Sequence, residues 1–193
     1  SKIEWITSDM GEWASIDINE NGDIRNGSDV WRVEDKERNI ATVVSGNITV
    51  TNDANADSVK VKITDNSGNT VDKEIFFSID KKAPDIQVSG IEASQDIKYY
   101  NSHKEVTVAI AERNFAAPKI NDTVDTSFAE DPSSPKNTHD HRHFKKISFD
   151  SDGKYSLDIS AEDLAGNKAA SYSSGQFVID TVAPKPSVQI RKE

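Results

Sequence analysis

The chain has 193 residues, of which 35% are hydrophobic, and a formal net charge of -10 at neutral pH. This acidity repels a polyanion, so a nucleic-acid partner is not expected. The chain contains no cysteine, which excludes a disulfide framework, a thiolate nucleophile and a zinc site built on cysteine. No apolar run reaches the ~18 residues that a membrane-spanning helix needs, so membrane insertion is not expected either.

A short motif occurs twice in the sequence, about 100 residues apart, and divides the chain. The first copy is TDNSGN followed by FSIDKKAP, within residues 64–84. The second copy is EDLAGN followed by FVIDTVAP, within residues 162–184. A period of about 100 residues is too long for a solenoid and suits one β-sandwich domain. The sequence therefore predicts two β-sandwiches in tandem.

Residues 1–81 are predicted to form the first domain from short strands, because apolar and polar residues alternate without lasting helical periodicity. Asn21-Gly22 follows the alternating run 14–18 and favours a tight hairpin. A second hairpin is expected around 66–69, where Val59, Val61 and Ile63 face the return strand of Ile75, Phe77 and Ile79. Further strands are expected at 30–33, 40–44 and 48–50.

Residues 82–181 are predicted to form the second domain. Its apolar positions alternate in the same way, at Ile86, Val88, Val106, Val108, Ile110, Ile147, Phe149, Tyr155, Leu157, Ile159, Ala161, Phe177 and Ile179. Tyr155 follows Asp152-Gly153, which predicts a tyrosine corner, where the phenol hydrogen-bonds nearby backbone. Residues 182–193, with alternating Val188 and Ile190, are expected to begin a further repeat or to form a tail.

Several motifs of the second domain occur together, in order and spacing. They are Tyr99-Tyr100-Asn101, Ile110-Ala111-Glu112-Arg113-Asn114-Phe115, Ile147-Ser148-Phe149, Asp152-Gly153, Asp163-Leu164-Ala165-Gly166-Asn167, Ile179-Asp180 and Ala183-Pro184. Residues 85–184 thereby resemble the bacterial Ig-like domain repeats of Gram-positive cell-surface and secreted proteins. The first domain shares only the closing hairpin and the linker. The resemblance implies an all-β chain of tandem immunoglobulin-like β-sandwiches, extracellular, with neighbouring Ig-like repeats in the parent chain and no catalytic residues.

Two functions from different classes fit this resemblance. The leading hypothesis is a monomeric, non-catalytic structural or adhesive module of a surface or wall-attached protein, which contacts a host or matrix protein or a glycan. The alternative is an accessory, glycan-binding module of a secreted carbohydrate-active enzyme. Carboxylates in catalytic spacing, a serine nucleophile elbow and a phosphate-binding glycine loop are all missing from the sequence. The sequence therefore predicts no catalytic residue, no cofactor and no metal site.

The segment that begins at Asp17 matches the first half of a calcium loop. Asp17, Asn19 and Asn21 supply oxygen ligands at alternate positions, and Gly22 suits the sharp turn. The second half does not match, because Ser28 stands where the bidentate carboxylate belongs. A plain hairpin is the preferred interpretation, and calcium binding by these residues stays an alternative.

Three histidines, His139, His141 and His143, would lie on one side of an extended segment, a spacing that suits zinc or nickel. They end the polar, proline-containing stretch 116–143, which has no periodicity and is predicted to be a long loop. Solvated histidines are the preferred interpretation over a metal site. A rigid sandwich can present such a loop, so any receptor or glycan contact is expected in 116–143, with a tolerated insertion as the alternative.

The tryptophans Trp5, Trp13 and Trp31 all fall in the first domain. Core positions are preferred for them over an exposed sugar-binding platform, because large aromatic side chains dominate the burial of small sandwiches.

Overall fold

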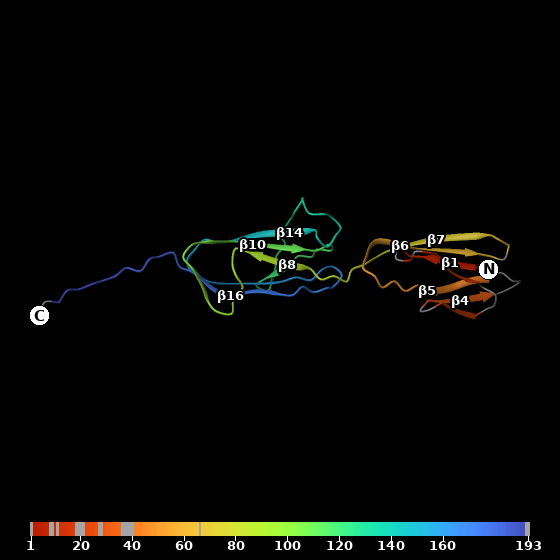
Figure 1. The fold of residues 1–193 in the computed structure, drawn as a ribbon, viewed down its shortest axis with the longest axis horizontal. Helices are drawn as coiled ribbons and strands as arrows, with labels where there is room; N and C mark the ends of the chain where they lie inside the picture. Colours follow the sequence, from red (N-terminus) through yellow and green to blue (C-terminus); the bar gives the residue numbers. More distant parts are fainter. Residues whose placement is uncertain are drawn as a thin grey trace. The chain divides into compact units, whose positions relative to one another are not determined.

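The computed structural model describes residues 2–7, 10, 12–17, 22–26, 29–35, 41–65 and 67–191, and within 16–47 it describes the backbone alone. All regular structure in these residues is β-strand, arranged in four sheets. The described chain contains no helix long and apolar enough to cross a membrane. The predicted all-β class is therefore confirmed. The chain forms two compact units, unit 1 (Ser1–Asp80) and unit 2 (Lys81–Glu193), which are coloured red to yellow and yellow-green to blue in Figure 1.

Unit 1 contains two antiparallel sheets. Its strands are β1 (Lys2–Ile6), β2 (Ala14–Asp17), β3 (Gly22–Asn26), β4 (Asp29–Asp35), β5 (Ala41–Asn47), β6 (Ala54–Thr64) and β7 (Thr70–Ile79). One sheet has the order β2-β1-β6-β7 and the other the order β3-β4-β5. The strands predicted at 30–33 and 40–44 fall on β4 and β5, whereas residues 48–50 lie outside any strand.

The predicted hairpin at Asn21-Gly22 is wrong. Strand β2 pairs with β1, where Ile16 lies opposite Ile3, whereas β3 pairs with β4 in the other sheet. The chain therefore passes from one sheet to the other between β2 and β3. A turn dipeptide reports a local backbone preference, but the pairing partner depends on which apolar faces are buried together.

The predicted hairpin around Gly68 is confirmed. Strands β6 and β7 pair antiparallel outward from Thr64 and Thr70, with Val59 opposite Ile75. The Asp65 carboxylate accepts hydrogen bonds from two backbone amides of the turn, at 2.8 Å each. Gly68 has a φ of 87°, in the left-handed region that glycine adopts without steric cost.

The tryptophans of unit 1 differ in burial. Trp5, on β1, is 1% exposed and forms a buried cluster with Ile3, so its predicted core position is confirmed. Trp13 is 46% exposed, and its predicted burial is wrong. It precedes β2, which is an edge strand of its sheet and therefore has a neighbouring strand on one side only. The side chain of Trp31 lies outside the described part of the chain.

Unit 2 also contains two sheets. Its strands are β8 (Asp85–Ser89), β9 (Lys98–Tyr100), β10 (Lys104–Ala111), β11 (Lys119–Ile120), β12 (Thr123–Val124), β13 (Ala129–Glu130), β14 (Arg142–Phe149), β15 (Gly153–Ser160) and β16 (Tyr172–Ile179). The sheets have the orders β13-β14-β10-β8 and β12-β11-β15-β16-β9. Strand β9 is one edge of the second sheet and pairs parallel to β16.

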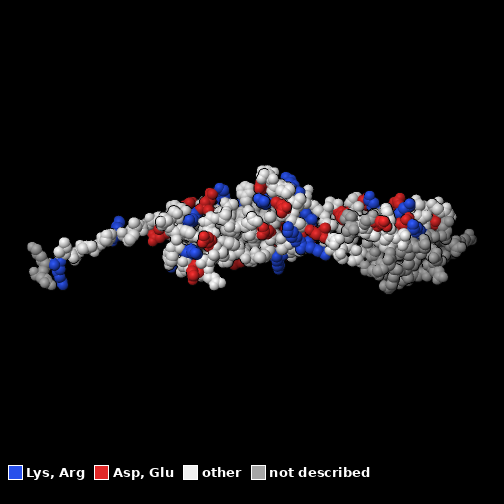
Figure 2. Space-filling model, viewed as in Figure 1, with Lys and Arg blue, Asp and Glu red and all other residues white. Residues whose placement is uncertain are grey.

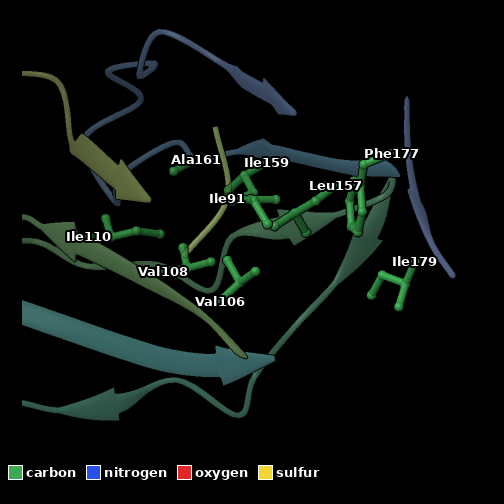
Figure 3. Packing of buried hydrophobic residues seen from close by; sticks show 9 residues of the cluster. All are labelled: Ile91, Val106, Val108, Ile110, Leu157, Ile159, Ala161, Phe177 and Ile179. Carbon is green, nitrogen blue, oxygen red and sulfur yellow. The ribbon is translucent and has the colours of Figure 1, made fainter. Parts of the chain in front are cut away.

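The hydrophobic core of unit 2 draws on both sheets, which gives a β-sandwich-like arrangement. Figure 3 shows β10 side chains on one side and those of β15 and β16 on the other. The buried cluster consists of Ile91, Val106, Val108, Ile110, Leu157, Ile159, Ala161, Phe177 and Ile179. The alternation read from the sequence therefore identifies the inward-facing residues of these three strands, because successive side chains of a strand point to opposite faces.

The predicted tyrosine corner is confirmed. The Tyr155 hydroxyl donates a hydrogen bond to the backbone carbonyl of Ser151, at 2.9 Å. The Tyr155 ring packs edge-on against Phe149, with ring centroids 5.0 Å apart. This contact fastens the connection between β14 and β15 to the core.

The strand predicted around Val188 and Ile190 is not formed. Residues 180–191 carry no regular structure, and both side chains are exposed. Alternation alone does not produce a strand, because an unpaired segment makes none of the ladder hydrogen bonds that stabilise one.

Candidate functional site

The stretch 116–143 is more structured than its sequence predicted. Strands β11 and β12 pair with each other and extend one sheet at β15, and β13 extends the other sheet at β14. Pro118 is buried, and Ile120 and Phe128 pack against the core. The prediction of one long aperiodic loop is therefore wrong. The strands have only two residues each, too few to produce a period-2 pattern.

The longest part of this stretch outside any strand is the segment 131–141, between β13 and β14, which we call the presented segment. Its turns are closed by its own side chains. The Asp131 carboxylate accepts hydrogen bonds from the Ser133 amide at 2.9 Å and hydroxyl at 2.6 Å. The Ser134 hydroxyl accepts one from the Arg142 amide at 2.9 Å, which ties the segment to β14. In Figure 1 this segment projects beyond β14.

Two of the three histidines of this region lie together, because the His141 and His143 rings meet edge-on with centroids 4.9 Å apart. His141 Nε2 lies 3.0 Å from Glu130 Oε1, and the His143 ring stacks on Phe115 with centroids 3.8 Å apart. Burial lowers the pKa of His143 below its usual range, and the neighbouring His141 lowers it further. In the described chain, no group of three or more metal-ligating side chains contains two of the three histidines. His139 lies in a turn before β14, which begins at Arg142, so the extended segment that the prediction assumed does not include it. The side chains of His139 and His141 are only 16% and 12% exposed, so the prediction of solvated histidines is wrong.

An ion pair fastens the stretch 116–143 to β14. Lys145 Nζ donates a hydrogen bond to the Asp125 carboxylate, which also accepts bonds from the Ser127 amide at 2.9 Å and hydroxyl at 2.7 Å. These donors, Lys145 foremost, lower the pKa of Asp125 to about 2.

We expect Lys145→Met to raise the pKa of Asp125 toward its ordinary value. The pKa of Asp125 is lower in the folded state than in the unfolded chain, so the pair stabilises unit 2 above the unfolded pKa of 3.8. This stabilisation is lost as the pH falls through about 2. Both side chains are partly exposed, so the loss at neutral pH is at most about 1 kcal/mol.

NMR titration of the Asp125 carboxyl carbon and urea unfolding between pH 2 and 6 measure the two effects. Lys146→Met is the matched control, because Lys146 pairs instead with the exposed Glu105, at 2.8 Å. An unchanged Asp125 titration in Lys145→Met contradicts this assignment of the cause.

Glu112 directly follows β10 and is 1% exposed. Its amide donates a hydrogen bond to the carbonyl of His141 at 2.8 Å. Its Oε1 accepts one from the Asn114 amide at 2.8 Å and lies 3.6 Å from His139 Nδ1. Its Oε2 is buried and has no hydrogen-bond partner among the described residues. Glu112 is thus a buried carboxylate with one oxygen that the described residues leave without a hydrogen bond.

The second copy of the repeated turn lies beside Glu112. Asp163 is 5% exposed, and its Oδ1 accepts two backbone amides of the turn at 2.8 Å each. Its Oδ2 accepts a hydrogen bond from Asn167 Nδ2, at 2.8 Å. The Leu164 amide donates to the carbonyl of Asn114 at 3.0 Å, which holds the turn against the segment that follows β10. Carboxylate oxygens of Glu112 and Asp163 lie within 4.8 Å of one another.

The sequence offers only a faint signal for this pair. Glu112 ends an alternating apolar strand, and Asp163 opens the repeated turn, but 50 intervening positions separate them in the chain. Nothing local indicates that the two carboxylates meet. Their proximity follows from the packing of β10 in one sheet against β15 in the other.

A separate feature of unit 1 surrounds the exposed Trp13. Its ring borders a hollow of about 420 Å³, which charged side chains also line. These are Lys60, Lys62, Asp72, Lys73 and Glu74. An aromatic ring bordered by hydrogen-bonding groups has the chemistry of a sugar platform, which the sequence did not reveal because these groups come from separate strands.

The predicted calcium loop and the surface charge complete the description of candidate sites. Asn19 and Asn21 lie outside the described residues, as does the side chain of Asp17, so calcium binding there stays an untested alternative. Figure 2 shows acidic side chains scattered over the described surface of each unit, with lysine and arginine among them. Charge on this face therefore does not single out a site.

No protein-family model, curated protein or solved structure matches this chain.

Proposed function

We propose that this chain is a non-catalytic structural and adhesive module of a bacterial surface protein, built from tandem immunoglobulin-like sandwiches. Unit 2 presents the binding surface, which is the presented segment 131–141. The partner is a host or matrix protein or a glycan, met outside the cell, and the flanking parts of the parent chain are further repeats of the same kind.

The observation that carries the proposal is the way the presented segment is held. Asp131 and Ser134 close its turns and join it to β14, while Lys136 Nζ contacts Glu130 Oε1 at 2.8 Å. A segment ordered in this way loses little conformational entropy on binding, which favours affinity. The tyrosine corner at Tyr155 and the two-sheet core support an immunoglobulin-like scaffold, in which function resides in such connections.

The second candidate function is glycan binding by unit 1, as an accessory module of a carbohydrate-active enzyme. The observation that favours it is the exposure of Trp13 beside the hollow lined by Lys60, Lys62, Asp72 and Glu74. The indole face would stack on a sugar ring, and the charged groups would hydrogen-bond its hydroxyls.

We expect replacement of Pro135-Lys136-Asn137 by Gly-Ser-Gly to lower adhesion to host cells or matrix proteins by at least about tenfold, since a few central residues dominate most interfaces. This variant retains Asp131 and Ser134, and glycine suits the positive φ of 58° at Asn137. Replacement of all of 116–143 is unsuitable, because it removes Pro118 and other residues packed in the core.

Binding of the full chain and the variant to cells, immobilised matrix proteins and a glycan array provides the measurement. Trp13→Ala is the second arm, and it separates the two candidates. Adhesion lost in the segment variant and retained in Trp13→Ala supports the adhesive module. Glycan binding lost only in Trp13→Ala supports the accessory module instead, and binding unchanged in both variants contradicts both sites.

A further inference from the structure

The Glu112 carboxylate is buried without enough donors to satisfy it. Its Oε1 accepts one backbone amide, that of Asn114, and its Oε2 accepts no hydrogen bond from the described residues. Buried carboxylates ordinarily have a hydrogen-bond donor, a cation or a metal for each oxygen, because desolvation of an unpaired charge costs several kcal/mol. The unsatisfied oxygen therefore calls for a partner that the described residues do not supply.

A second buried carboxylate, that of Asp163, strengthens the need for a partner at Glu112. A carboxylate oxygen of Asp163 lies within 4.8 Å of a carboxylate oxygen of Glu112, and both side chains are at least nine-tenths buried. Like charges this close repel each other, and the repulsion grows where water is excluded. A positive charge between the two carboxylates would offset both the repulsion and the desolvation.

The first copy of the repeated turn, which contains Asp65 in unit 1, shows which features of Asp163 the turn itself requires and which occur only in unit 2. Asp65 makes the same bonds as Asp163, accepting the Ser67 and Asn69 amides at 2.8 Å and Asn69 Nδ2 at 2.7 Å. Asp65 is more exposed than Asp163, and no acidic cluster found in the described chain contains it. The turn hydrogen bonds therefore account for an aspartate at this position, but they do not account for its burial against a second carboxylate.

The His139 side chain beside Glu112 does not complete the arrangement. His139 Nδ1 lies 3.6 Å from Glu112 Oε1, which is longer than a hydrogen bond, and it lies on the oxygen that already accepts an amide. A cation bound by both carboxylates would satisfy Oε2 of Glu112, and it would also explain why the Asp163 carboxylate lies so close.

We propose that Glu112 and Asp163 bind a calcium ion at this end of unit 2. The donors are carboxylate oxygens, which a hard cation prefers, and the chain has no cysteine to favour a softer metal. Calcium binds oxygen at 2.3–2.6 Å, so two ligands of one calcium ion lie at most about 5.2 Å apart. The carboxylate oxygens of Glu112 and Asp163 lie within 4.8 Å of one another, which is inside that limit. Water and backbone carbonyl oxygens complete the coordination shell of six to eight oxygens.

The ion links two segments that are far apart in the sequence. Glu112 belongs to the connection after β10, and Asp163 to the turn between β15 and β16. Calcium would thereby stiffen this end of unit 2 through the contact that Leu164 already makes with Asn114. The inference does not rest on the adhesive function, and it departs from the sequence-based expectation of no metal site.

Isothermal titration of the full, EDTA-treated chain with calcium chloride tests the proposal. We expect one saturable site, weakened at least about tenfold by Glu112→Gln, which removes the charge and keeps the shape. Calcium at ~100 times the dissociation constant should stabilise unit 2 against unfolding, detected as a higher melting temperature, because it binds only the folded state. Asp65→Asn is the matched control in the homologous turn, and it should bind calcium as the unaltered chain does.

NMR chemical-shift mapping on the unaltered chain keeps the test decisive if Glu112→Gln fails to fold. Calcium-dependent shifts at the amides of Asn114, Ala165 and Asn167 support the site. Shifts confined to residues 17–24 place the ion elsewhere and overturn the proposal. It is also overturned by the absence of saturable heat, or by calcium binding that survives Glu112→Gln unchanged.

Discussion

Phe177→Ala is expected to lower the free energy of unfolding of unit 2 by about 3–5 kcal/mol. Phe177 is 2% exposed and lies where three other aromatic rings meet. The centroid of the Phe177 ring lies 5.1 Å from that of Phe149, 5.6 Å from that of Tyr155 and 6.1 Å from that of Tyr100. Alanine leaves a cavity among rigid rings on both sheets, which cannot close by small movements, so the full cost of the lost contacts remains.

Chemical unfolding measures this loss when it is monitored through spectroscopic signals from both units. Tyr99→Ala is the control, because Tyr99 is 73% exposed on the adjacent strand β9 and its removal should cost no more than about 0.5 kcal/mol. A Phe177→Ala loss as small as that of Tyr99→Ala would mean that the aromatic cluster does not support the sandwich.

Gly175→Ala is expected to destabilise unit 2 by more than about 3 kcal/mol, through two effects that add. Gly175 has a φ of 67°, in the left-handed region, where an alanine costs roughly 1–2 kcal/mol. A Cβ at this position would also collide with the backbone carbonyl oxygen of Ser94. That carbonyl belongs to a segment bound to β16 through the Ser94 amide and the Ser174 carbonyl, 3.1 Å apart, so it cannot move without breaking this bond.

Gly68→Ala separates these two effects. Gly68 also has a positive φ, of 87°, but a Cβ there would meet no atom within 4 Å. Its substitution should therefore cost only the backbone term, roughly 1–2 kcal/mol. Unfolding free energies of the two variants give the comparison, and equal losses would show that the contact with Ser94 carries no cost.

Much of the architecture could be read from the sequence because it depends on neighbouring residues. The inward side of β10, at Val106, Val108 and Ile110, follows from alternation, since a strand points successive side chains to opposite faces. The turn at Gly68 and the corner at Tyr155 follow from the chemistry of a few consecutive residues. The immunoglobulin-like identity of the two units stays a prediction, carried by resemblance in the motifs of residues 85–184.

The features that the sequence did not reveal depend on contacts between residues far apart in the chain. The alternating run that contains Ile16 predicts a strand, but only the packing of the sheets decides that β2 pairs with β1 and not with β3. The two-residue strands within 116–143 form because the edges of β14 and β15 offer them partners. The carboxylates of Glu112 and Asp163 meet because two sheets bring their connections to the same end of unit 2, and burial leaves an oxygen of Glu112 there that none of the described residues satisfies.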